Sequence, residues 1–129
     1  MPGWLYTVLL LSLGGVVGTN ARFWLGRWIA THPWAQNFPL GTLIINVSGS
    51  LIFAVAGVLF LERYPQRSQW FLLVATGFCG AYTTFSTFEW ETIQLVRKGD
   101  WPLAIVYVLA SVLAGFVAVV IVVSADDWF

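Results

Sequence analysis

The sequence predicts an all-α membrane protein with four membrane-spanning helices. Of its 129 residues, 59% are hydrophobic and 9% are charged, whereas about one quarter of the residues in a soluble domain are charged. The mean hydropathy of +0.81 comes from four long apolar runs with short polar connections between them. A chain this small has too much surface for its volume to bury those runs in one globule. The lipid bilayer is therefore the expected solvent.

Each apolar run approaches the roughly 20 residues that a spanning helix needs. We expect helices at approximately residues 4–30, 40–62, 69–96 and 102–124, within a single domain that covers residues 1–129. Turn-forming residues and charges fill the three connections. Tryptophans near the helix ends fit an interfacial aromatic belt, at positions 4, 28, 34, 70, 101 and 128.

Small residues mark the first and fourth expected helices. Gly14, Gly15 and Gly18 in the first helix, and Ser111 with Gly115 in the fourth, have the spacing that lets helices approach closely. We interpret both groups first as packing residues. Tyr107 lies on the same side of the fourth helix as Ser111.

The second expected helix has a polar face. Thr42, Asn46, Gly49 and Ser50 share it at helical spacing, and the opposite face is aliphatic. An amide in hydrocarbon must be hydrogen-bonded or hydrated. Asn46 therefore has two interpretations: it either joins helices by hydrogen bonds, or it lines a pore.

The third expected helix carries two glycines and then hydroxyl residues interleaved with aromatics, from Gly77 to Phe88. This composition weakens a helix, so we expect a break near its middle. Carbonyls freed by a break can coordinate a hard cation such as sodium. The rings of Phe85 and Phe88 either pack in the core or turn their positive edges toward an anion beside hydroxyl and amide donors. The run favours a small anion as cargo.

Several functional classes do not fit the sequence. The net charge is zero, so no nucleic-acid partner is expected. Enzymatic activity is not expected, because His32 stands alone in a connection and no nucleophile and base converge. A proton-coupled multidrug transporter needs an embedded carboxylate, and we interpret Glu89 and Glu91 as solvated charges near the membrane surface. A non-transporting assembly subunit, with polar residues used only for packing, remains an alternative.

The positive charges give almost no orientation bias. Arg63 and Arg67 fall on one side, against Arg27, Arg97 and Lys98 on the other, if a partly embedded Arg22 is left out. We therefore expect a dual-topology protein that inserts both ways and pairs antiparallel.

Four motifs together resemble the Fluc, or CrcB-type, fluoride channels: the glycine-rich run 14–22, the run 41–46 with Gly49, the run 77–80, and Thr83-Thr-Phe-Ser-Thr-Phe88. The resemblance extends over essentially the whole chain. It implies an antiparallel dual-topology homodimer with two pores in the bacterial inner membrane. Such a channel passively exports fluoride from the cytoplasm and so lowers fluoride toxicity.

The resemblance also assigns roles to individual residues. It implies that the edges of Phe85 and Phe88 face fluoride, that Asn46 is a pore donor, and that Arg22 lies in a vestibule. Further pore residues are implied in the matched run and, less tightly, in the fourth helix, namely Thr84, Ser86, Thr87, Tyr107 and Ser111.

A structural sodium ion on the dimer axis is a further implication of the resemblance. It would be bound by the backbone carbonyls of Gly80 and Thr83, at the break in the third helix. The sequence departs from the family pattern here. A second glycine is expected directly after Gly80, but Ala81 and then Tyr82 follow it.

Overall fold

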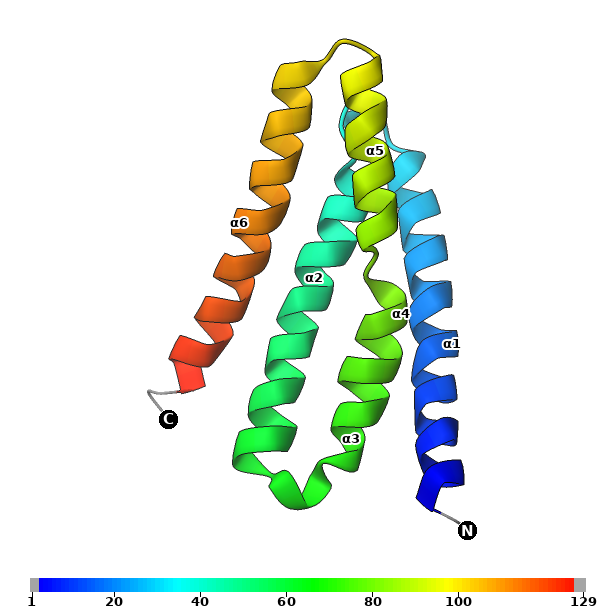
Figure 1. Ribbon diagram of the computed structural model, residues 1–129, viewed down its shortest axis with the longest axis vertical. Helices are drawn as coiled ribbons and strands as arrows, with labels where there is room; N and C mark the ends of the chain where they lie inside the picture. The colour runs from blue at the N-terminus through cyan, green and yellow to red at the C-terminus, as the bar shows by residue number, and fades with distance from the viewer. Residues whose placement is uncertain (1–2, 127–129) are drawn as a thin grey trace.

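The computed structural model describes residues 3–126, so Trp128 of the expected aromatic belt lies outside it. Within that range the chain runs back and forth as four long helical spans (Figure 1). All four are long and apolar enough to cross a membrane: Gly3–Ala30, Leu40–Arg63, Gln69–Arg97 and Trp101–Asp126. The prediction of an all-α protein with four membrane-spanning helices is confirmed.

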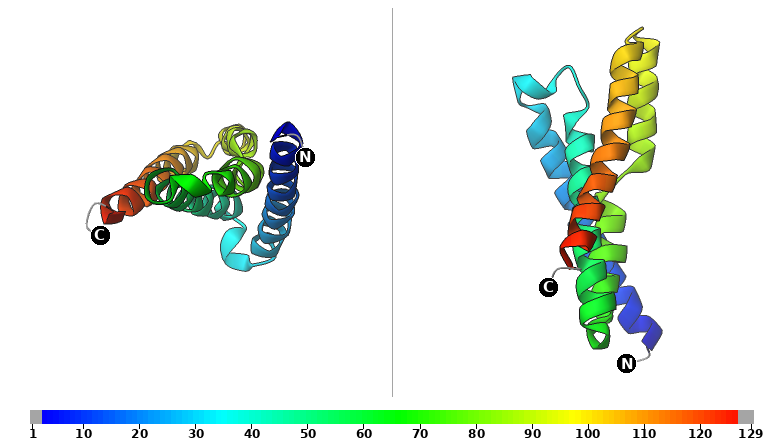
Figure 2. Two further views of the ribbon diagram at one scale, coloured as in Figure 1. Left: turned by 90° about the horizontal axis from the view of Figure 1, so that it is seen from below. Right: turned by 90° about the vertical axis from the view of Figure 1, so that its left-hand side faces the viewer.

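Two spans lie at the outside of the bundle and two between them. α1 (Gly3–Ala30) and α6 (Trp101–Asp126) flank α2 (Leu40–Gly57) and the third span, as Figure 1 and the left panel of Figure 2 show. α1 packs mainly against the third span, and α6 packs mainly against α2. The outer faces of α1 and α6 expose many large apolar side chains, as lipid contact requires.

Short helical turns and tight turns connect the spans. The first two connections contain η1 (Pro33–Ala35) and η3 (Pro65–Arg67), each with proline at its start. α2 continues into η2 (Val58–Arg63), which has the wider π-type hydrogen bonding. Gly99 has φ +83° in the last turn, where the N–H of Asp100 bonds back to the carbonyl of Leu95. This is the left-handed helix ending that glycine favours.

The third span consists of four helical pieces. α3 (Gln69–Phe71), the π-helical η4 (Leu72–Cys79) and α4 (Gly80–Tyr82) follow one another without interruption. Thr83 and Thr84 then have extended backbone, with ψ of 159° and 116°. α5 (Phe85–Arg97) follows, and Figure 1 shows the short non-helical segment between α4 and α5.

Glycines bring α1 against η4 at backbone distance. A Cβ atom on Gly14 would collide with the carbonyl of Leu73 and lie 2.7 Å from the nitrogen of Phe78. One on Gly18 would collide with the Phe78 carbonyl. A Cβ atom on Gly15, in contrast, would meet no atom of another helix within 4 Å among residues 3–126. The packing interpretation therefore applies to Gly14 and Gly18 in this chain.

A cluster of buried apolar side chains lies between α5 and α6. Tyr107 is fully buried there, together with Leu95 and Ala104. Phe38 from the first connection and Phe88 from α5 pack around its ring. This cluster joins the second half of the third span to α6.

Candidate functional site

The extended pair Thr83–Thr84 is bonded by side chains from two other spans. The amide of Asn46 on α2 makes two hydrogen bonds with Thr84: its Nδ2 donates to the carbonyl at 3.0 Å, and its Oδ1 accepts from the N–H at 2.8 Å. Backbone groups that lose their helical partners must be satisfied inside a membrane. Asn46 provides the hydrogen-bond partner that the N–H of Thr84 lacks.

Arg22 reaches the same segment from α1. Its guanidinium donates to the carbonyl of Thr83 at 3.3 Å, and the side chain is partly buried. A positive charge therefore lies beside the extended pair, well inside the first span.

Thr84 also caps α5. Its Oγ1 accepts from the N–H of Thr87 at 3.2 Å and donates to the hydroxyl of Thr87 at 2.9 Å. Thr84 is the N-cap residue of a 13-residue helix, whose first N–H groups and positive dipole end therefore point toward the extended pair. This end of α5 favours an anion.

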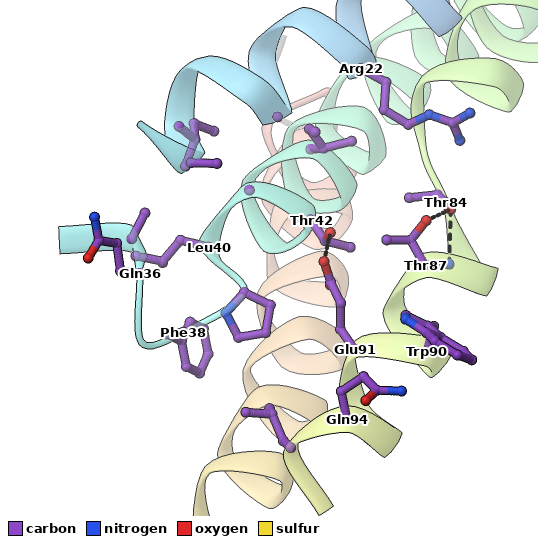
Figure 3. A pocket seen from close by; sticks show the side chains of 18 of the residues that line it. Arg22, Gln36, Phe38, Leu40, Thr42, Thr84, Thr87, Trp90, Glu91 and Gln94 are labelled. Atoms are coloured by element: carbon purple, nitrogen blue, oxygen red, sulfur yellow. Dashed lines mark hydrogen bonds between the residues drawn. The ribbon is translucent and has the colours of Figure 1, made fainter. Parts of the chain in front are cut away.

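A cavity of about 710 Å³ leads to this point from one end of the bundle. The first connection and Lys98 line its outer part, and Arg22 and Thr84 line its inner part (Figure 3). Polar side chains from one face of α5 run along it at helical spacing: Thr84, Thr87, Glu91, Gln94 and Lys98.

Glu91 lies inside this polar row and is not a solvated end charge, so that expectation is wrong. Thr42 donates to its Oε1 at 2.9 Å, and Tyr107 donates to its Oε2 at 2.7 Å. Thr42 is itself buried, and Figure 3 shows its contact with Glu91. Position along the sequence suggested a charge at the membrane surface, whereas the i, i+3, i+7 spacing from Thr84 would have indicated the cavity. Glu89 is exposed at the protein surface.

The two phenylalanines differ in their surroundings. Their ring centroids are 5.8 Å apart with planes at 38°. Phe88 is partly buried and packs on Tyr107 at 5.2 Å, whereas Phe85 is 71% exposed. A large aromatic side chain thus stands open at the middle of the third span, directly after the extended pair.

Gly80 and Thr83 line a second cavity of about 400 Å³ between α2, the third span and α6. The N–H of Thr84 donates to Asn46 and not to the carbonyl of Gly80, its partner in a continuous helix. The carbonyl of Gly80 is thereby released from helical hydrogen bonding with residue 84.

The other predicted site residues line neither cavity, namely Asn46, Phe85, Phe88, Ser86, Tyr107 and Ser111. Ser86 is exposed at the start of α5. Tyr107 is buried in the packing between α5 and α6, and Ser111 donates to the carbonyl of Tyr107 in its own helix at 2.7 Å. The structure thus gathers Arg22, Thr84 and Thr87 at one cavity and Gly80 with Thr83 at another, and Asn46 bonds to the segment between them.

Comparison of the sequence with known proteins relates the chain to one family. Residues 9–123 match the family described as CrcB-like protein, Camphor Resistance (CrcB). A protein of Solibacter usitatus named fluoride-specific ion channel FluC is 44% identical over 86% of this chain and 90% of its own. The protein of that name from Chloroflexus aurantiacus is 37% identical over 95% and 96%. The one from Pyrococcus abyssi is 39% identical over 84% and 86%.

Proposed function

The chain belongs to the CrcB-like family, and we propose on this basis that it is a fluoride-specific ion channel. It passes fluoride passively out of the cytoplasm and catalyses no covalent reaction. The observation that carries the proposal is the junction at Thr83–Thr84. There the N-terminal end of α5, the guanidinium of Arg22 and a cavity with one row of polar side chains come together at the middle of a membrane span.

Each part of the junction has a role in passing an anion. The cavity brings water and the ion toward the middle of the span, and Arg22 and the positive end of α5 offset the cost of burying a negative charge. The hydroxyl of Thr87 lies along the cavity and can donate there, whereas Thr84 donates its own hydroxyl proton to Thr87. The edges of Phe85 and Phe88 carry partial positive charge and can replace part of the hydration shell.

We propose that two copies of the chain pair antiparallel as a dual-topology homodimer in the bacterial inner membrane. The exposure of Phe85 supports this, because a second copy would cover that ring and complete a pore of which this chain contributes one half. The near-even distribution of positive charge supports insertion in both directions.

We propose further that a structural sodium ion sits on the dimer axis, bound by carbonyls of Gly80 and Thr83. The residues fit such a site, since both line one cavity and the carbonyl of Gly80 is released from helical bonding with Thr84. Backbone carbonyls are suitable ligands for a hard cation. The ion would supply positive charge and tie the two copies together. Arg22 donates to the carbonyl of Thr83, so two positive charges, the ion and the guanidinium, would share this carbonyl.

The proposed function can be tested in cells. A bacterium without its own fluoride exporter is grown in fluoride medium with this chain or with an Asn46→Leu variant at equal membrane abundance. We expect growth with the natural chain and poor growth with the variant. Equal growth of both, or poor growth with both, contradicts the proposal.

Dual topology has its own test. A cysteine is placed in the 62–67 connection of a Cys79→Ser background and labelled with a membrane-impermeant reagent. Labelling of about half the molecules from each face is expected. Labelling from one face only excludes the antiparallel homodimer.

A further inference from the structure

Tyr82 closes α4 directly before the extended pair, and its hydroxyl is bonded to α2. The oxygen lies 2.9 Å from Oγ of Ser48. Ser48 donates its own proton to the carbonyl of Ile45 at 3.2 Å, so Tyr82 is the donor to Ser48. A chain of two hydrogen bonds therefore connects the end of α4 to the backbone of α2.

The ring of Tyr82 is enclosed, with 5% of the residue exposed. It stacks on Phe78 at a centroid distance of 5.1 Å and an angle of 16°. Gly49 on α2 leaves room for the ring of Tyr82. A Cβ atom at Gly49 would lie 3.2 Å from that ring and would collide with the side chain of Thr83. On the α1 side, a Cβ at Gly18 would lie 3.1 Å from the nitrogen of Tyr82. The end of α4 is thus wedged between α1 and α2.

We propose that Ser48 and Tyr82 form a positioning pair that sets the place of the extended residues for ion passage; this inference rests on the proposed function. Ser48 lies two residues after Asn46, so a single turn of α2 bonds to both residue 82 and residue 84. A phenylalanine at position 82 would fill the same space without this connection. Release of Tyr82 then lets Thr83 and Thr84 shift relative to Arg22 and Asn46.

The test compares Tyr82→Phe, Ser48→Ala and the double variant with the natural chain. Fluoride efflux from liposomes and amide hydrogen exchange at Thr84 are measured on each, with a peptide from α6 as the exchange reference. Tyr6→Phe is the matched control, because it removes a hydroxyl from a tyrosine exposed on α1. Ser48→Thr keeps the hydroxyl and serves as the conservative variant.

We expect each single variant to reduce efflux, and to speed exchange at Thr84, by about threefold, the size of a typical hydrogen bond between membrane helices. The double variant should be no worse than either single one, since both remove the same bond. Tyr6→Phe and Ser48→Thr should behave as the natural chain. Unchanged efflux or unchanged exchange in Tyr82→Phe, or additive losses in the double variant, overturns the positioning role. If the natural chain passes no fluoride, the proposed function fails, while exchange at Thr84 still decides whether the pair holds the segment.

Discussion

The side chain of Asn46 pairs with the backbone of Thr84 as one peptide group pairs with another, accepting from the N–H at 2.8 Å and donating to the carbonyl at 3.0 Å. As the N-cap residue of α5, Thr84 keeps the first helical bond to its carbonyl, but its N–H has no helical partner inside the membrane. The amide of Asn46 on a neighbouring helix replaces that partner. The second N–H of this amide is left for another acceptor, such as a passing anion, so joining helices and lining a pore are compatible roles.

Asn46→Leu tests this pairing. The variant leaves the N–H of Thr84 without a partner, at about 1–3 kcal/mol, and removes one of the two bonds to its carbonyl. We expect fluoride efflux at least about tenfold slower and a lower thermal unfolding midpoint in detergent. Asn20→Leu is the matched control, because Asn20 is exposed on α1 and donates only to the carbonyl of Val16 in its own helix. Full efflux with Asn46→Leu would show that the pairing is not needed.

The contact between α1 and η4 depends on Gly14 and not on Gly15. A methyl group at Gly14 has no room beside the Leu73 carbonyl, and forcing it in costs about 1–3 kcal/mol. Gly15→Ala adds the same atoms where the chain leaves open space, and alanine is up to about 1 kcal/mol better in a helix. We expect Gly14→Ala to lower the unfolding midpoint and Gly15→Ala to keep or raise it. Equal effects would mean that this backbone contact does not stabilise the fold.

Tyr107 holds Glu91 in place within the α5 row. Tyr107→Phe keeps the ring between α5 and α6 but removes the donor to Oε2 of Glu91. We expect a loss of about 1–3 kcal/mol in the free energy of unfolding. The exposed Tyr64 provides the control variant Tyr64→Phe, which should have no effect on unfolding. The comparison is made by thermal unfolding in detergent, and similar midpoints for both variants would contradict this assignment.

Alanine variants of Phe85 and Phe88 should distinguish an effect on permeation from an effect on packing. Phe85 is exposed in the single chain, so Phe85→Ala should reduce fluoride efflux while the stability of the chain changes little. Phe88 packs on Tyr107, so Phe88→Ala should reduce efflux and also cost roughly 2 kcal/mol of stability, less than for a fully buried ring. Efflux and unfolding are measured on the same preparations. Natural efflux with Phe85→Ala would assign this ring to packing.

Hydropathy was sufficient to predict four spanning helices, because a bilayer imposes length and apolarity on each span separately. The sequence predicted that glycines of the first helix allow close packing, but not which of them make the contact with η4. Spacing alone does not distinguish Gly14 from Gly15, since the difference depends on which side of α1 faces η4.

The site was harder to predict than the fold. The Thr-rich run identified Thr84 and Thr87, but Glu91 was judged by its distance from the membrane centre and not by its face on α5. A polar row from Thr84 to Gln94 was present in the sequence at helical spacing. The partners of these side chains, Thr42 and Tyr107, come from other spans, and single-helix patterns contain no information about them.

The most direct test of the account is fluoride efflux from liposomes that contain only this protein, measured with a fluoride electrode and compared with chloride efflux under the same gradient. The account predicts rapid fluoride efflux, chloride efflux close to that of protein-free liposomes, and strongly reduced fluoride efflux with Asn46→Leu. No fluoride efflux from the natural protein, or chloride efflux at an equal rate, would contradict it.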